Sequence, residues 1–382
     1  MVKLFNIKHS NFNRRSYTFE QSRAEQSRAE QSRAEQSRAE QSRAERIDWI
    51  DFGKGLTVLM VVLGHVVLGL FESNRFESSE TILLFITQIL YLYHIPVFFA
   101  LSGFFFKPIS DGSHLWTYIK QKTIALGIPY LFYSIIQFTL QTIGGASVRN
   151  AASLSDLFNI YQTPLGVSWY LYVLWWLYLV LGILSLWIKK AEQWMLVAVV
   201  AFILAMFFPV KMYIVQKLLL WTFFFIIGYW LRQSGLYKMF EKNWKGVTVV
   251  SLAVIGVFMV FWQLSNPEFY ISYDTPGGWG MIFPVSVFLA FAVYPILNKY
   301  DRFGNYFRKI GKDSIVIYLL HAPIVSVTRI ILLKLGIDNV IIHVVIGLLA
   351  GWYGSLLGLF LMKRIPYCDF VFYPIKYIKK QK

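Results

Sequence analysis

Residues 46–71 read RIDWIDFGKGLTVLMVVLGHVVLGLF, and their composition indicates the solvent in which this chain folds. From residue 52 onward the side chains are largely apolar, and the main interruptions are Lys54 and His65. A run of about 20 such residues is long enough to cross the hydrocarbon core of a bilayer, which is about 30 Å thick. The sequence therefore predicts a transmembrane helix over residues 52–71.

Comparable apolar runs recur along the rest of the chain. Hydrophobic residues make up 56% of the 382 residues and charged residues 15%, whereas a typical soluble domain has about 25% charged residues. The sequence therefore predicts an all-α, polytopic membrane protein with about ten transmembrane helices. We assign its net charge of +16 to membrane topology and expect no nucleic-acid partner, because no soluble basic domain is visible. The expected spans are 52–71, 82–106, 123–143, 167–188, 194–210, 212–231, 246–264, 279–297, 314–333 and 340–362.

The loops between these spans differ in their content of Lys and Arg. With both termini in the cytoplasm, the internal loops and the C-terminal tail hold 20 basic residues and the external loops hold four. Basic loops stay on the cytoplasmic side, so we expect a multi-pass protein of the bacterial inner membrane with both termini inside. The expected parts are a tail at 1–45, a membrane domain at 46–364 and a short basic cytoplasmic tail at 365–382.

Residues 21–45 are five identical copies of QSRAE. A five-residue period places Arg and Glu on every face of a helix, so no apolar stripe forms, and we expect a disordered or loosely helical tail. The pentanucleotide CAGAG in tandem reads CAG, AGC, AGA, GCA, GAG, which encodes Gln, Ser, Arg, Ala, Glu. We therefore expect a repeat tract that changes length by slippage and makes the protein phase-variable.

Three histidines, His65, His94 and His321, fall near the middle of predicted spans, where ionisable side chains are functional candidates. Lys54 and His65 are 11 residues apart, which on a helix is about 16 Å of rise and an angular offset of about 20°. Asp51 lies one turn before Lys54 on nearly the same face. We expect His65 to act as a general base with Lys54 and Asp51 in support. The alternative is that Asp51 and Lys54 form an interfacial ion pair only.

Two of these histidines precede a proline by two residues, in His94–Ile–Pro96 and His321–Ala–Pro323. Pro96 removes a helical hydrogen bond, so the helix could open a polar cavity beside His94, near Ser102. Asp313 or Ser314 is expected to cap the helix that carries His321.

Other polar and aromatic residues of the spans have competing interpretations. Arg329 lies further toward the outside and needs a partner there. Trp169 is a candidate for substrate binding or for the interfacial aromatic belt.

Four stretches carry a resemblance to a known family. The chain resembles the integral-membrane acyltransferase family 3, especially its fucose 4-O-acetylase-like branch. Lys54 stands where that family typically has Arg, and lysine does not bind a carboxylate or phosphate bidentately. The stretches are D-x-x-K-G-x9-H at Asp51 to His65, H-x-P-x-F-F-x-x-S-G-F at His94 to Phe104, S-W-Y-L at Ser168 to Leu171, and I-G-K-D-S-x-x-I-Y-L-L-H at Ile310 to His321.

The resemblance implies a ten-helix core, acyl-CoA as donor, and a hydroxyl of a surface glycan or its lipid-linked precursor as acceptor. It also places the family's essential histidine at His65. The donor is then acetyl-CoA or succinyl-CoA, with no metal, and the product belongs to a surface polysaccharide such as lipopolysaccharide or capsule. His94, Ser102, His321 and Trp169 are expected to position the acceptor, and the two histidines could instead stabilise the oxyanion.

The phosphates of CoA call for a basic site on the cytoplasmic side. We expect the pantetheine arm to enter along the Lys54 face and to bring its thioester to His65. There His65 acts as general base on a sugar hydroxyl or, as the alternative, carries the acyl group itself. The positive-inside rule alone could also account for the basic residues of this site. The candidate cofactor-binding residues are Lys120, Lys122, Arg308, Lys309 and Lys312.

A second hypothesis is a transporter or flippase of a glycan or lipid-linked sugar, since ten spans with broken helices and a polar interior suit that class too. The two halves of the sequence show no inverted repeat. The sequence shows no metal-ligand cluster. Its single cysteine, Cys368, excludes an intrachain disulfide. The oligomeric state is not predicted.

Overall fold

The computed structural model describes residues 47–145, 152–265 and 279–378, so the QSRAE repeats of the predicted tail lie outside the described residues. Those residues form helices and their connections, with no strand among them. The longer helices are α2 (Asp48–Phe71), α3 (Glu80–Gly103), α4 (Leu115–Lys122), α5 (Ile128–Gly144), α7 (Trp169–Leu184), α8 (Ala191–Phe207), α9 (Tyr213–Gln233), α11 (Trp244–Ser265), α12 (Pro284–Leu297), α13 (Asp301–Gly311), α14 (Ser314–Lys334) and α15 (Val340–Arg364). The shorter ones are α6 (Leu154–Phe158), α10 (Leu236–Lys242) and α16 (Pro374–Ile378).

Nine helices within the described residues are long and apolar enough to cross a membrane. The predicted span at 194–210 corresponds to α8, which is apolar but has 17 residues, near the lower limit for crossing a bilayer. The fold class is therefore confirmed as an all-α, multi-pass membrane protein.

Three predicted loops are helical, which corrects the boundaries drawn from hydropathy. Helix α4 continues through a π-helical turn into α5, so the third span covers Gly112–Gly144 and begins before residue 123. Helices α10 and α13 occupy the predicted loops 232–245 and 298–313. These segments carry too many charged residues to read as spans, although α13 buries one face against the bundle.

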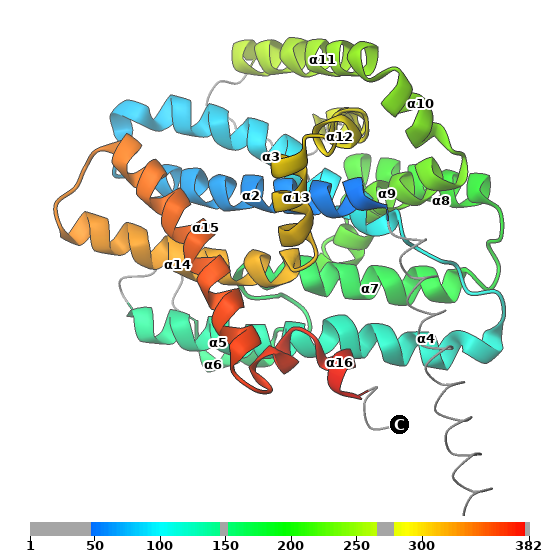
Figure 1. Cartoon of the computed structure of the whole chain (residues 1–382), viewed down its shortest axis with the longest axis horizontal. Coiled ribbons are helices and arrows are strands. Elements are labelled where there is room, and N and C mark those ends of the chain that lie inside the picture. Colours follow the sequence, from blue (N-terminus) through cyan, green and yellow to red (C-terminus); the bar gives the residue numbers. More distant parts are fainter. Residues whose placement is uncertain (1–46, 146–151, 266–278, 379–382) are drawn as a thin grey trace, which may run out of the picture. The chain divides into compact units, whose positions relative to one another are not determined.

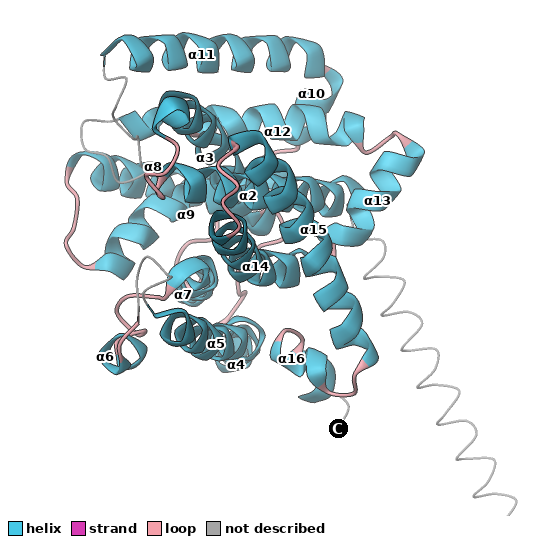
Figure 2. Cartoon of the chain, turned by 90° about the vertical axis from the view of Figure 1, so that its left-hand side faces the viewer, coloured by secondary structure: helices cyan, strands magenta, loops and turns pink. Residues whose placement is uncertain are grey.

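Helix α2 runs through the middle of the bundle, as the two views of Figures 1 and 2 agree. Within the described stretch 49–71, no residue is exposed. Helix α11 lies at the edge of the bundle in both figures, and it exposes apolar side chains such as Val249, Val257 and Leu264. An apolar surface of this kind suits contact with lipid, whereas α2 has no exposed residue from Trp49 to Phe71.

Glycines bring two pairs of helices into backbone contact. A Cβ at Gly55 would lie 2.2 Å from the carbonyl oxygen of Phe307, and a Cβ at Gly311 would lie 1.7 Å from that of Asp51. No side chain fits at these distances, so the Lys–Gly and Gly–Lys pairs of two sequence motifs fix α2 against α13. Gly103 and Gly228 hold α3 against α9 in the same way, with Cβ positions 1.8 and 1.9 Å from backbone oxygens.

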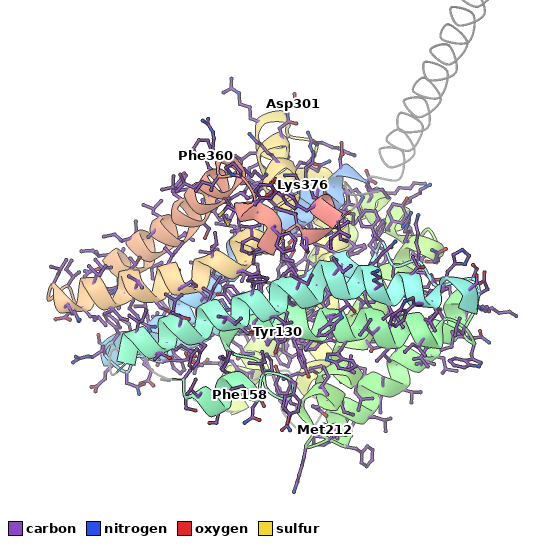
Figure 3. The ribbon with its side chains drawn as sticks, turned by 90° about the horizontal axis from the view of Figure 1, so that it is seen from below. Tyr130, Phe158, Met212, Asp301, Phe360 and Lys376 are labelled. Atoms are coloured by element: carbon purple, nitrogen blue, oxygen red, sulfur yellow. The ribbon has the colours of Figure 1, made fainter. Side chains whose placement is uncertain are left out.

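The segment after α15, residues 365–378, folds back on the bundle, and we refer to it as the C-terminal hook (Figure 3 labels its Lys376). The buried carboxylate of Asp369 accepts a hydrogen bond of 2.7 Å from Lys376 Nζ and another from the Tyr377 hydroxyl. The hydroxyl of Tyr373 donates to Asp313 at 2.5 Å, just before α14. The part of the predicted basic tail that the structure describes is thus tied to the helix that carries His321.

Candidate active site

The three mid-span histidines come together from three different helices. The ring centroid of His65 on α2 lies 4.9 Å from that of His321 on α14 and 6.3 Å from that of Tyr91 on α3. The Tyr91 ring in turn lies 4.7 Å from the ring of His94. We call these four residues the histidine cluster. The three histidines, which were predicted to lie at a similar depth in the membrane, therefore also lie close together.

Gly64 lies where α2 approaches α3 in this cluster. A Cβ at this position would lie 3.2 Å from His94 Cε1, closer than most side-chain carbons approach, and 3.5 Å from Tyr91 Cε2, an ordinary van der Waals contact. The glycine that precedes His65 therefore leaves the space that the His94 ring occupies.

Two of the imidazoles have their tautomer set by their own helix. Nδ1 of His94 lies 2.5 Å from the carbonyl oxygen of Leu90, and Nδ1 of His321 lies 3.2 Å from that of Ile317. Because a carbonyl only accepts, each neutral ring carries its proton on Nδ1. Among the described residues, Nε2 of each ring is buried and has no hydrogen-bond partner. Each Nε2 therefore presents a lone pair that can accept a hydrogen bond or a proton.

This tautomer narrows the roles expected for the two histidines. A neutral ring with Nδ1 protonated cannot donate from Nε2, so it cannot stabilise an oxyanion there. It can accept a hydrogen bond from a substrate hydroxyl. The geometry of His94 and His321 therefore favours positioning of the acceptor over stabilisation of the oxyanion.

His65 differs from the other two in accessibility. The side chains of His94 and His321 are 0% exposed, whereas His65 is half-buried. Its ring lies beside the rings of His321 and Tyr91, which belong to two other helices of the bundle. This position suits a group that must meet a substrate within the bundle.

Three cations gather about 16 Å from the histidine cluster along α2, the rise of 11 residues. The Lys54 ammonium lies 5.6 Å from the centroid of the Phe105 ring, and the Arg232 guanidinium lies 5.4 Å from the same centroid. Lys122 on α4 lies close enough to Lys54 for the two charges to repel each other. We call Lys54, Lys122 and Arg232 the basic cluster, and the end of the bundle where it lies the basic end.

The basic cluster is suited to an anion. All three side chains are half-buried, which strengthens their attraction for a negative charge relative to open solvent. Arg232 also offers a planar guanidinium, which binds phosphate bidentately, as lysine cannot.

The other predicted cofactor residues lie outside the basic cluster. Arg308 donates to Asn298 at 2.8 Å and to Asn305 at 2.5 Å, so it ties α13 to the preceding turn. Lys120, Lys309 and Lys312 are exposed. Of the five residues named for this role, the structure thus brings only Lys122 to the cluster.

The face of α2 between Lys54 and His65 is apolar and closely packed. Val58 and Val61 lie on that face and are 0% and 3% exposed. Asp51 is buried one turn before Lys54. The face along which we expected the pantetheine arm to enter is therefore apolar between Lys54 and His65, and these valines offer no partner to a polar ligand.

Ser102 on α3 and Trp169 on α7 lie outside the histidine cluster. Ser102 is half-buried, and its Oγ lies 2.9 Å from the hydroxyl of Tyr170. Trp169 is half-buried between Phe99 and Trp221, whose ring centroids are 6.3 and 5.8 Å away. Trp169 therefore packs within an aromatic group of the bundle, and its substrate-binding role stays a prediction.

Two further predictions concern α14. Asp313 is at the N-cap position of α14 and Ser314 is the first residue of the helix, but the Asp313 side chain makes no capping hydrogen bond. Its carboxylate binds Lys363 at 2.5 Å and Tyr373 instead. The expected cap was wrong because two charged or polar partners from distant elements compete for the carboxylate. Arg329 has the partner it needs, since its guanidinium donates to the carbonyl oxygen of Gly69 on α2.

Several residues near the site carried no signal strong enough to be found in the sequence. Arg232 was counted only as a topology marker. Tyr91, Tyr170 and Tyr318 belong to a chain in which 18% of residues are aromatic, so one more tyrosine in a span is not informative. The hydroxyl of Tyr318 donates to the Val167 carbonyl at 2.6 Å, and its ring lies 5.9 Å from His321.

The fold and the site define a polytopic helical membrane protein with a buried cluster of imidazoles. The model of one protein family, described as an acyltransferase domain, matches residues 47–360. The chain therefore belongs to the acyltransferase 3 family. The match covers every helix of the histidine cluster and the basic cluster.

Two curated proteins show the extent of similarity to individual relatives. Nodulation protein NolL of Mesorhizobium japonicum is 24% identical over 220 residues, which is 55% of this chain and 55% of that protein. Nodulation protein NolL of Sinorhizobium fredii is 26% identical over 197 residues, 48% of each chain. The chain thus spans about half the length of the curated relatives it matches. No solved structure matches it.

Proposed function

We propose that this protein is a membrane acyltransferase that transfers an acetyl group from acetyl-CoA to a sugar hydroxyl of a cell-surface polysaccharide or its lipid-linked precursor. The observation that carries the proposal is the pairing of His65 with His321, 4.9 Å apart at the centre of the bundle. Ionisable side chains such as these are energetically costly inside a membrane, and those that occur there usually have a function. Family membership favours this enzyme over the transporter considered from the sequence.

In the proposed reaction, His65 removes the proton from the sugar hydroxyl. The oxygen attacks the thioester carbonyl, and the resulting tetrahedral intermediate releases CoA as a thiolate. The thiolate takes the proton back from the imidazolium of His65, so no proton is gained or lost. His94 and His321 accept hydrogen bonds from other sugar hydroxyls at Nε2 and thereby orient the acceptor.

The basic end is the proposed entrance for the donor. The phosphates of CoA would bind to Lys54, Lys122 and Arg232, and the linear pantetheine arm would cover the distance to His65. This assignment is consistent with a cytoplasmic basic end, as the positive-inside rule requires. Both termini would then be cytoplasmic and the protein would lie in the bacterial inner membrane.

The test is acetyl transfer by purified protein, followed by mass analysis of the glycan. We expect His65→Ala to lower the rate by about 10²–10⁴-fold, the usual contribution of general-base catalysis. His343→Ala is the matched control: this histidine is 2% exposed in α15 and bonds the Ile337 carbonyl at 2.7 Å, outside the cluster. Wild-type rates for a folded His65→Ala protein would refute the proposed role.

Phase variation by the repeat tract is a separate part of the proposal. It rests on the agreement of QSRAE with a CAGAG tandem, in a tail that lies outside the described residues. The gene sequence tests it, since synonymous codons that interrupt CAGAG would prevent slippage.

A further inference from the structure

A continuous line of hydroxyl-bearing and aromatic side chains joins the basic cluster to the histidine cluster. It begins at Lys122, whose ammonium lies 3.8 Å from the centroid of the Tyr178 ring. The Tyr178 hydroxyl donates to the backbone carbonyl of Ser102 at 3.3 Å, and Ser102 Oγ lies 2.9 Å from the Tyr170 hydroxyl.

The same line continues to the imidazoles. The Tyr170 ring lies 5.2 Å from the Tyr318 ring, and the Tyr318 ring lies 5.9 Å from His321. His321 in turn contacts His65. The line is built by α3, α7 and α14, and it lies apart from the Val58 and Val61 face of α2.

The chemistry of this line differs from that of the α2 face. A pantetheine arm carries two amides and a hydroxyl, and burying such groups without partners is unfavourable by several kcal/mol in apolar surroundings. Ser102 and Tyr178 are half-buried and offer hydroxyl groups inside the bundle, and the buried Tyr170 and Tyr318, at 4% and 6% exposure, carry two more. Val58 and Val61, at 0% and 3% exposure, are buried to a similar degree but offer no polar atom.

We propose that the pantetheine arm of the acyl donor runs between α3, α7 and α14, along Tyr178, Ser102, Tyr170 and Tyr318, and not along the Lys54 face of α2. This inference rests on the proposed function, because it assigns a path to the same donor. It makes Ser102 and Tyr170 positioning residues for the donor, where the sequence suggested that Ser102 contacts the acceptor.

The depths of Ser102 and Tyr178 within the bundle support the proposed path of the pantetheine arm. Ser102 lies eight residues after His94 on α3, about 12 Å closer to the basic end, and Tyr178 lies eight residues after Tyr170 on α7. The serine hydroxyl is therefore at an intermediate depth, between the cations that would hold the phosphates and the imidazoles that would meet the thioester.

The experiment uses cysteine accessibility in the full chain, whose only native cysteine is Cys368. In a Cys368→Ser background, Ser102→Cys is compared with Val58→Cys on the α2 face. Ser286→Cys is a matched control, because Ser286 is 0% exposed in α12 and bonds the Phe283 carbonyl at 2.6 Å. The probe is methyl methanethiosulfonate, with and without acetyl-CoA, which has no free thiol.

We expect acetyl-CoA at about ten times its Kd to slow modification of Ser102→Cys about tenfold, in line with its occupancy. The Val58→Cys and Ser286→Cys variants should react at rates that acetyl-CoA leaves unchanged. Protection of Val58→Cys without protection of Ser102→Cys would overturn the proposed path in favour of the α2 face.

A kinetic variant keeps the test decisive where a cysteine variant fails to fold. Tyr170→Phe keeps the ring and removes the hydroxyl that meets Ser102, so the KM for acetyl-CoA should rise about fivefold with kcat little changed. An unchanged KM in a chain that binds and uses acetyl-CoA overturns the path alone. Absence of acetyl-CoA binding by the unsubstituted chain overturns the path together with the proposed function.

Discussion

The substitution Gly64→Ala should affect the geometry of the histidine cluster more than the stability of the bundle. Replacing glycine by alanine within a helix stabilises it by about 0.5–1 kcal/mol, because the unfolded chain loses freedom. Here the new methyl would lie 3.2 Å from His94 Cε1 and 3.7 Å from its Nδ1. Overpacking of a buried site typically costs about 1–3 kcal/mol, so the gain offsets only part of the cost and the net loss is at most about 2.5 kcal/mol.

The effect on catalysis should be larger than the effect on folding. To relieve the contact, the His94 ring must move by a few tenths of an ångström, against the hydrogen bond that fixes it to Leu90. A misplacement of 1 Å in an active site can lower rates about 10²-fold. We therefore expect acetyl transfer by Gly64→Ala to fall about three- to tenfold, with a thermal midpoint at or slightly below that of the wild type.

The assay compares initial rates and thermal unfolding of the purified protein in the same detergent. Gly256→Ala on α11 is the matched control, because no atom of the described residues outside its own helical turns lies within 4 Å of its Cβ position. It should retain wild-type rates. Full activity of Gly64→Ala would refute the idea that the position of His94 matters for the reaction.

The remaining predictions address charge, tautomer and pH. Arg232→Gln should raise the KM for acetyl-CoA about tenfold by removing a charged phosphate donor, whereas exposed Lys120→Gln should not, as steady-state kinetics would show. His321→Gln, whose amide reaches the Nε2 position, should retain about tenfold more activity than His321→Asn, whose amide reaches only the Nδ1 position. Burial alone would raise the pKa of Asp369, but hydrogen bonds from its lysine and tyrosine partners outweigh that effect and hold the pKa below its ordinary 3.8. A carboxyl with a lowered folded pKa stabilises the fold above about pH 4 and loses that effect at lower pH, so proteolysis of the C-terminal hook should accelerate there.

Each of these predictions has an outcome that contradicts it. Equal KM values for the Arg232 and Lys120 variants would remove Arg232 from the donor site. Greater activity of the asparagine variant of His321 would show that the bond to the Ile317 carbonyl matters more than the free nitrogen. A hook that is cleaved equally at every pH, with the Asp369→Asn variant as reference, would show that this carboxylate does not hold it.

Hydropathy predicted the class of fold because a helix that crosses a bilayer needs about 20 consecutive apolar residues, and such a run is visible in a short stretch of sequence. The same rule failed for α13, which crosses α2 in Figure 1 and buries only one face, including Phe307 and Gly311. Its other face carries charges. A hydropathy window averages the two faces, so a helix of this kind reads as a loop.

The depth of a residue in the membrane also follows from its position within a predicted span, and for this reason the three histidines could be recognised as one group. The helix against which a given face packs does not follow from the local sequence. Lys54 and His65 do share a face of α2, but the packing fills that face with Val58 and Val61. Arg232 comes from α9, and nothing in its local sequence separates a ligand-binding arginine from a topology marker.

The histidine cluster is rich in acceptors, and this bears on which substrate it binds. Proline has no N–H, so Pro96 and Pro323 each leave a carbonyl of the preceding turn, at the buried residues Leu92 and Leu319, without its usual helical donor. The same two helices present the Nε2 lone pairs of their histidines. Four acceptors in an apolar bundle require donors, because unpaired polar groups are unfavourable there. A sugar supplies several hydroxyl donors, whereas a thioester carbonyl supplies none, so this part of the site is suited to the alcohol and leaves the donor to approach from the opposite, basic end.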